Sequence, residues 1–184
     1  AKIIDARLRY PELQNAKSPK TIVILGGNSK THKFTNDAAL ELIEKLKILA
    51  KNGATLWITA SRRTPENICE MFREFCKEAG ASFFESEVKD GANPYLSWLT
   101  NADAAIITED SANMIADAAF FKLPIHLVKL QGSSNKFDKL HQSFINIGAA
   151  KWFNGSLNIW TYSPINSVAE IAKEIVAKTP KTHK

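Results

Sequence analysis

A polar turn between two apolar stretches carries the strongest chemical signal in this sequence. Residues 104–108 form an apolar run of strand length, and a helical pattern follows over 113–121. The acidic and hydroxyl residues between them suit a turn and a helix N-cap. The first N–H groups of a helix lack partners within the helix and attract anions. Capping alone would explain one of these polar residues, whereas an anion site would use several of them: Glu109, Asp110, Ser111 and Asn113.

A glycine pair follows the apolar run 21–25, in the sequence Gly26-Gly27-Asn28-Ser29. Paired glycines allow a backbone to approach a phosphate closely. They equally suit a tight turn between a strand and a helix, and the sequence leaves both interpretations open. The spacing matches neither the G-x-G-x-x-G dinucleotide fingerprint nor a P-loop. We take Gly26, Gly27, Asn28 and Ser29 as candidates for contact with a phosphate-bearing small molecule and predict no cofactor.

Two arginines follow the run 54–60, in the sequence Ser61-Arg62-Arg63. The guanidinium group is a rigid fork of donors that suits a phosphate or a carboxylate. We predict that Ser61 and at least one of Arg62 and Arg63 contact an anionic ligand. The alternative is a solvated pair of arginines, or a salt bridge to Glu66 or Glu109.

Asp117 lies further along the helix that follows the polar turn. Its carboxylate is placed to accept hydrogen bonds from the vicinal hydroxyls of a ribose. The alternative is an exposed helix residue that binds nothing.

The histidines and cysteines predict neither a metal site nor a disulfide. None of His32, His126, His141 and His183 is followed by a second ligand at helical spacing, and we expect His126 in the core and His141 near a cleft. Cys69 and Cys76 would lie roughly 10 Å apart on one helix, too far for a disulfide. We expect reduced thiols. Because no G-x-S-x-G or H-E-x-x-H motif is present, hydrolase and metalloenzyme chemistry lack support.

Strand and helix patterns alternate along the chain. Strand-like runs lie at 21–25, 54–60, 82–85, 104–108 and 125–128, and helical patterns at 36–51, 65–79, 95–99, 113–121, 137–147 and 167–177. Thr64 suits an N-cap and Pro65 a first helical residue, while the aromatic stretch 151–164 is expected to be irregular. The alternation predicts an α/β fold, a doubly wound, mainly parallel sheet of about five or six strands with helices on both faces. Ligands of such sheets bind at the carboxyl ends of the strands.

The composition fits one globular domain within the 184 residues. The net charge of +5 favours anionic ligands or a generally basic surface. No basic stripe with interleaved aromatics is present, so we predict no nucleic-acid partner. No apolar run approaches the ~18 residues that cross a bilayer, so we predict no transmembrane segment and leave peripheral contact with a membrane open.

The order of short motifs resembles one known family. GGNS, SRRTP, NPY (93–95), TEDS (108–111) and the Leu123-Pro124 step before a strand occur in this order. Together they resemble the mitochondrial-fission elongated-mitochondria family of plants and alphaproteobacteria, over residues 21–177. More distantly, the segment 110–124 is similar to the nucleotide-sugar-binding segment of two-domain B-type glycosyltransferases. The resemblance implies that Ser111 faces a diphosphate and that Asp117, where a glutamate is usual, holds the ribose.

The resemblance also implies a domain plan and two functions. Residues 1–20 would be a linker or the tail of a preceding lobe, 21–178 a Rossmann-like nucleotide-sugar-binding domain, and 179–184 a disordered tail. The chain would then be half of a cytoplasmic, metal-independent glycosyltransferase, completed by an N-terminal domain and located in the cytoplasm or at the inner membrane. The alternative is a non-catalytic interaction module, because Asp117 replaces the usual glutamate and Lys122 a usual glycine. The catalytic residues stay unknown.

Overall fold

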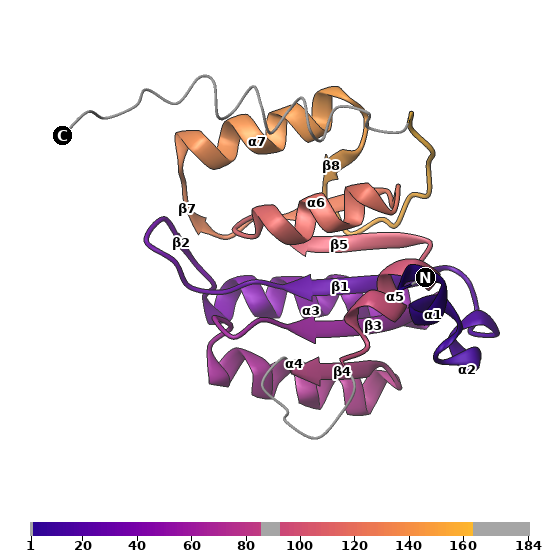
Figure 1. The fold of residues 1–184 in the computed structure, drawn as a ribbon. Helices are drawn as coiled ribbons and strands as arrows, with labels where there is room; N and C mark the ends of the chain where they lie inside the picture. Colours follow the sequence, from indigo (N-terminus) through magenta and orange to yellow (C-terminus); the bar gives the residue numbers. More distant parts are fainter. Residues whose placement is uncertain (1, 86–92, 164–184) are drawn as a thin grey trace.

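The centre of the molecule is a sheet of six parallel strands in the order β4-β3-β1-β5-β6-β8 (Figure 1). The structure, a computed structural model, describes residues 2–85 and 93–163. The strands are β1 (Lys20–Leu25), β3 (Thr55–Ala60), β4 (Ser82–Glu85), β5 (Ala104–Thr108), β6 (Ile125–Val128) and β8 (Ala150–Trp152). From β1 the chain first builds the sheet outward through β3 and β4, then returns to place β5 on the other side. This reversal is the switch point at which doubly wound sheets bind ligands.

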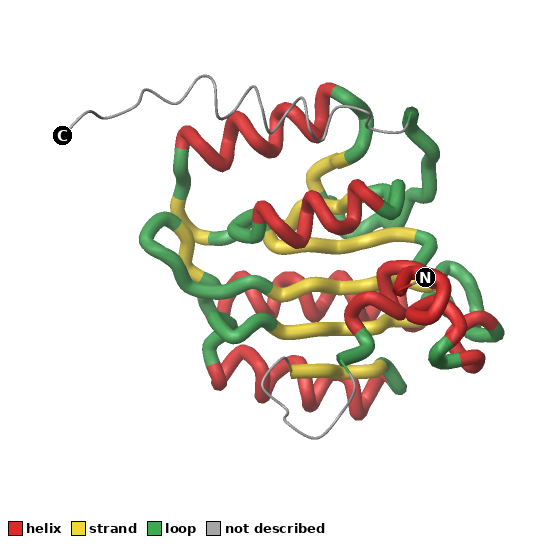
Figure 2. Tube along the Cα trace, viewed as in Figure 1, coloured by secondary structure: helices red, strands yellow, loops and turns green. Residues whose placement is uncertain are grey.

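Helices cover both faces of the sheet (Figure 2). One face packs against α3 (Asn36–Lys51) and α4 (Glu66–Ala79), the other against α5 (Tyr95–Asn101), α6 (Ala112–Phe120) and α7 (Asn135–Asn146). Neighbouring side chains of a strand point to opposite faces. Val23 and Leu25 of β1 accordingly pack on the α3 side, and Ile22 and Ile24 on the α6 side. Burial on both faces explains why β1 is a continuous apolar run.

The expected α/β class, with a doubly wound parallel sheet, is confirmed. The bounds of α3, β4, β5 and β6 are as predicted. The expectation of an irregular stretch over 151–164 is wrong at its start, because β8 pairs with β6 there. Only Ala150 of β8 is buried, so the strand has no apolar alternation to reveal it. The predicted helix over 167–177 and the tail over 179–184 lie outside the described residues.

Two small additions flank the sheet. A two-residue antiparallel ladder joins β2 (His32–Lys33) to β7 (Gln131–Gly132), which is too short to leave a pattern. The segment expected to be a linker contains α1 (Lys2–Leu8) and α2 (Pro11–Gln14), and α1 packs beside α5 (Figure 1). No helix in the described ranges, 2–85 and 93–163, has the length and apolar character needed to cross a membrane.

The start of α4 differs from the prediction by one residue. Pro65, not Thr64, is the N-cap, and the helix begins at Glu66. The Thr64 hydroxyl lies within 2.5 Å of the Gly26 carbonyl oxygen and donates to it. Thr64 therefore ties the arginine turn to the loop after β1 instead of capping the helix.

Candidate functional site

The three predicted loops meet at the carboxyl edge of the sheet. They follow β1, β3 and β5, which are neighbours. The N–H of Gly27 donates to Oδ2 of Asp110 at 2.9 Å. Nη2 of Arg63 donates to the same oxygen at 2.9 Å. Gly27, Arg63 and Asp110 therefore share one point, although they are far apart in the sequence.

Asp110 is the centre of this network. Its side chain is 0% exposed, and its Oδ1 accepts a hydrogen bond from the Thr108 hydroxyl at 2.8 Å. The Thr108 oxygen in turn accepts the N–H of Gly26 at 2.7 Å. A buried carboxylate needs such charge-assisted partners. The predicted alternative of a salt bridge from the arginine turn to Glu66 or Glu109 is wrong for Arg63, because its partner is Asp110.

The glycine pair makes room for this packing. A Cβ on Gly26 would lie 2.1 Å from Oδ1 of Asp110, and one on Gly27 would lie 1.9 Å from the Arg63 carbonyl oxygen. The next two amides are also paired, since Asn28 N–H donates to the Arg63 oxygen and Ser29 N–H to the His32 oxygen. All four loop amides thus donate to protein groups. The tight-turn interpretation explains both glycines without a ligand.

An open cleft of about 430 Å³ lies beside this network, between the end of β3, the start of α5 and the first turns of α6. Half of the predicted site residues line it: Ser61, Arg62, Arg63, Ser111, Asn113 and Asp117. The other half do not line it: Gly26, Gly27, Asn28, Ser29, Glu109 and Asp110. The remaining lining residues are Thr59, Ala60, Asn93, Tyr95 and Met114.

The cleft contains donors that the protein itself does not use. Ser111 is the N-cap of α6 but makes no capping bond with its side chain. Within 2–85 and 93–163, no group accepts a hydrogen bond from the N–H of Asn113 or Met114, which line the cleft, or from that of the adjacent Ala112. Arg62 is exposed and forms no ion pair with any described residue. The positive end of the helix dipole adds to this charge. The arrangement can hold an anion.

Tyr95 and Asp117 form the far wall of the cleft. The Tyr95 hydroxyl donates to Oδ2 of Asp117 at 3.0 Å. Burial, and then the Asp117 charge, raise the pKa of Tyr95 above its ordinary value, so the phenol stays a donor. Tyr95 and Asn93 were not among the predicted site residues. The Asn93 side chain caps the N–H of Tyr95 at 2.9 Å, and an asparagine two residues before a helix is the signal that locates them.

Glu109 points away from the cleft, to the opposite side of the backbone from Asp110. Its Oε1 accepts the N–H of Leu130 at 2.7 Å. His141 donates through Nε2 to the Glu109 carbonyl oxygen at 2.7 Å, and burial lowers the pKa of this histidine. Glu109 thus joins β5 to the chain after β6 and to α7. His141, expected near a cleft, is 1% exposed and does not line this one. His126 is buried, as predicted.

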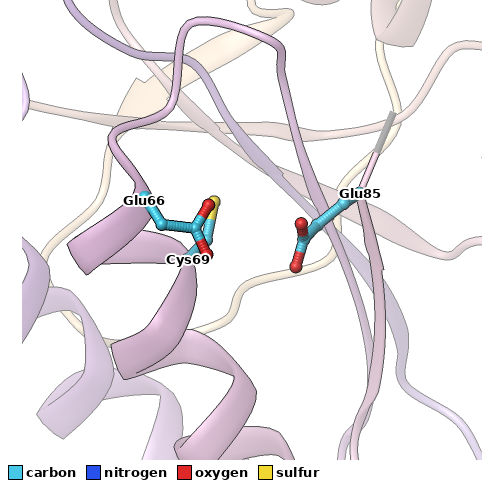
Figure 3. Close-up of side chains that lie close together, drawn as sticks. All are labelled: Glu66, Cys69 and Glu85. Atoms are coloured by element: carbon cyan, nitrogen blue, oxygen red, sulfur yellow. The ribbon is translucent and has the colours of Figure 1, made fainter. Parts of the chain in front are cut away.

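A third cluster lies on the outer side of β3. Figure 3 shows Glu66 and Cys69 of α4 facing Glu85 at the end of β4. Their ligand atoms lie within 4.8 Å of one another. Arg73 forms ion pairs with both carboxylates, and burial raises the pKa of the Cys69 thiol to about 11. The guanidinium therefore balances the charge that a cation would otherwise meet, and we treat the cluster as an ion-pair network. Cys69 and Cys76 are free thiols.

Comparison with protein families and curated relatives gives one consistent match. The family model described as mitochondrial fission ELM1 matches residues 1–179. An uncharacterized protein of Rickettsia prowazekii is 28% identical over 177 residues, which cover 94% of this chain and 49% of that protein. The mitochondrial fission protein ELM1 of Arabidopsis thaliana is 24% identical over 90% of this chain and 39% of its own length. The chain thus spans about half or less of these relatives.

Solved structures show the same fold at low identity. A family 9 glycosyl transferase from Veillonella parvula superposes with a TM-score of 0.52 at 14% identity, over 92% of this chain and 45% of that one. A putative UDP-N-acetylglucosamine 2-epimerase from Listeria monocytogenes gives 0.51 at 11% identity, over 91% of this chain and 39% of that one. These values establish the fold and nothing finer. The expected glycosyltransferase-like fold is confirmed.

Proposed function

The chain belongs to the mitochondrial fission ELM1 family, and we propose that its cleft beside α6 binds the nucleotide part of a nucleotide-diphosphate sugar. The glycosyltransferase-like fold supports this, since the cleft lies at the carboxyl edge where such sheets bind ligands. In a longer protein this domain would bind the donor. A preceding N-terminal domain would supply the acceptor site and the catalytic residues, which we leave unassigned.

The unpaired amides of α6, with Arg62 across the cleft, are the observation that carries the proposal. The diphosphate would accept hydrogen bonds from the N–H groups of Ala112 and Asn113 and from the Ser111 hydroxyl. Arg62 would neutralise its charge from the opposite wall, and Ser61 and Arg63 would border it. Helix dipole and guanidinium together would stabilise a departing diphosphate without a metal ion or a further cofactor.

Asp117 would hold the ribose. It lies six residues after Ser111 on α6, and one of its two carboxylate oxygens accepts the Tyr95 hydroxyl. The other oxygen is left to accept from a ribose hydroxyl. A location in the cytoplasm or at the inner membrane stays a prediction.

Isothermal titration with UDP, GDP and ADP tests this proposal. We expect measurable heat with at least one of them and weaker binding of the matching monophosphate, because one phosphate leaves part of the α6 terminus unused. The 2′-deoxy form should bind more weakly to the wild type but not to Asp117→Ala. Absence of heat at millimolar concentrations of all three diphosphates would end the proposal for this domain.

A second candidate is a non-catalytic interaction module. Lys122 favours it, since it has φ 59° and is the one non-glycine residue with positive φ in 2–85 and 93–163. The position implied to be a usual glycine is thus filled at a conformational cost. A pull-down from cell extract separates the two. Partner capture that survives both Asp117→Ala and Arg62→Ala favours a module, whereas loss on those substitutions ties the partner to the cleft.

A further inference from the structure

We infer that Asp110 is an internal anion that fills the phosphate position at the switch point. It would thereby make the edge of the sheet selective for ligands whose phosphate lies at α6 and not at the loop after β1. The occupied anion position is a property of the protein alone, whereas the selectivity for ligands rests on the proposed function.

The donors around Asp110 are those that an external oxyanion would use. Its carboxylate accepts from a glycine amide, a threonine hydroxyl and an arginine guanidinium, which belong to Gly27, Thr108 and Arg63. These groups come from three different elements and converge at distances of 2.8–2.9 Å. Phosphate sites in α/β proteins combine the same kinds of donor. Here a side chain with 0% exposure takes all of them.

The carboxylate also occupies the space next to the loop. A Cβ placed on Gly26 would lie 2.1 and 2.4 Å from its two oxygens, so the group rests directly against the Gly26 backbone. A dinucleotide bound in the usual manner sets its pyrophosphate against the loop after the first strand. In this protein that ligand would meet a negative charge, no free loop amide and no room.

The ion pair with Asp110 gives the two arginines different roles. Arg63 is held by Asp110, whereas Arg62 on the cleft has no ion-pair partner among residues 2–85 and 93–163. Among the residues that the structure describes, the free guanidinium and the unpaired α6 amides therefore lie at the cleft and not at the loop after β1. The class of ligand that fits is a nucleoside diphosphate with its phosphates at α6, and a dinucleotide that sets its pyrophosphate against the loop after β1 does not fit.

Small-anion complementation tests the occupied anion position. Asp110→Gly deletes the carboxymethyl group and leaves a buried space beside three donors, which formate fits. We expect sodium formate at ten times its Kd to raise the Tm of this variant by about 3–6 °C above an equal concentration of sodium chloride. Wild type should show no difference between the salts. If the variant folds only when formate is present, the inference is supported. An equal Tm in both salts, or failure to refold in either, would overturn it.

Gly26→Ala in the Asp110→Gly background is the matched control. Gly26 is not among the positive-φ glycines, so alanine fits the backbone once the carboxylate is gone. Its methyl group fills the formate position, and the double variant should lose the formate response. Retention of that response would place the bound formate elsewhere and contradict the inference.

Titration of ¹⁵N-labelled wild type with ADP and with NAD, which share one adenosine diphosphate unit, tests the selectivity for ligands. Amide shifts confined to α6 with both ligands support the selectivity, and shifts of the Gly26 and Gly27 amides with NAD would overturn it. If neither binds, the proposed function and the selectivity fail together, while the formate experiment still decides whether Asp110 is an internal anion.

Discussion

Two places at one edge of the sheet differ in how their donors are used. We call the buried network of Gly26, Gly27, Arg63, Thr108 and Asp110, between the ends of β1 and β5, the crevice. There the loop amides and Arg63 all donate to protein acceptors, and Asp110 lies at the centre. At the cleft between β3 and α6, the first amides of the helix have no acceptor, and Arg62 has no ion-pair partner, among the described residues. The crevice is therefore part of the stable core, and the cleft is where a ligand can gain contacts. Position at a switch point does not by itself identify a binding site.

The largest effect is expected from Asp110→Ala, which breaks the crevice. The buried donors of Gly27 and Thr108 lose their acceptor, and we expect a loss of about 3 kcal/mol in the free energy of unfolding. Urea denaturation measures it. Asp117→Ala is the matched control in the cleft, where the carboxylate is exposed, and should cost less than about 1 kcal/mol. Equal losses for the two variants would remove the distinction between crevice and cleft.

Gly27→Ala should rank second. The added methyl group would meet the Arg63 carbonyl at 1.9 Å, and relief requires a backbone shift that costs about 2–3 kcal/mol. Gly80→Ala is the control, because its Cβ would meet nothing within 4 Å and only its φ of 66° opposes alanine. That strain is worth about 1 kcal/mol. A smaller loss at Gly27 than at Gly80 would contradict the close packing described for the crevice.

Replacing each of the two arginines by alanine in turn compares their contributions to ligand binding and to stability. Arg62→Ala should leave stability within about 0.5 kcal/mol but weaken nucleoside diphosphate binding roughly tenfold or more, since a charge-assisted bond is lost. Arg63→Ala should lower the free energy of unfolding more than Arg62→Ala, because it leaves the buried Asp110 charge without its partner, and should weaken nucleoside diphosphate binding less, because Asp110 already holds this guanidinium. Calorimetric titration and urea denaturation of both variants provide the four numbers. If the two variants changed binding and stability to similar extents, Arg62 and Arg63 would not have the separate roles described here.

The smallest effect is expected from the Tyr95 phenol, through the free energy of unfolding at high pH. The raised pKa of Tyr95 means that the unfolded chain releases this proton first, near its ordinary pKa of 10.0. The stabilising contribution is thus complete below pH 10 and declines as pH rises further. Between pH 10 and 11 wild type should lose about 1 kcal/mol more stability than Tyr95→Phe. Parallel stability curves for the two proteins would mean that the phenol is not held by burial and Asp117.

The fold could be predicted from the sequence because its central strands are buried on both faces. Runs such as 104–108 are buried throughout and almost entirely apolar, and the turns after them contain the expected polar residues. β8 has one buried residue, and the β2–β7 ladder is two residues long on each side. Such short pairings depend on neighbours that are distant in the sequence, so their own residues give no signal.

The location of the site could be predicted from the sequence, but not which of its donors are already bound by protein groups. The turns of Gly27, Arg63 and Asp110 were expected to meet, and they do. The Gly27 amide is not free because it donates to the side chain of Asp110, which is 83 residues away in the sequence. The opposite orientations of Glu109 and Asp110 likewise depend on the turn that follows β5. Neither feature can be inferred from residue type alone.

Amide chemical shifts during a nucleotide titration test the central claim most directly. With ¹⁵N-labelled protein and UDP, GDP or ADP, the largest shifts should belong to the amides of Ala112, Asn113 and Met114, while those of Gly26 and Gly27 stay nearly unchanged. Large shifts confined to the glycine amides would show that the ligand enters the crevice, and the division between an occupied and an open anion site would be wrong.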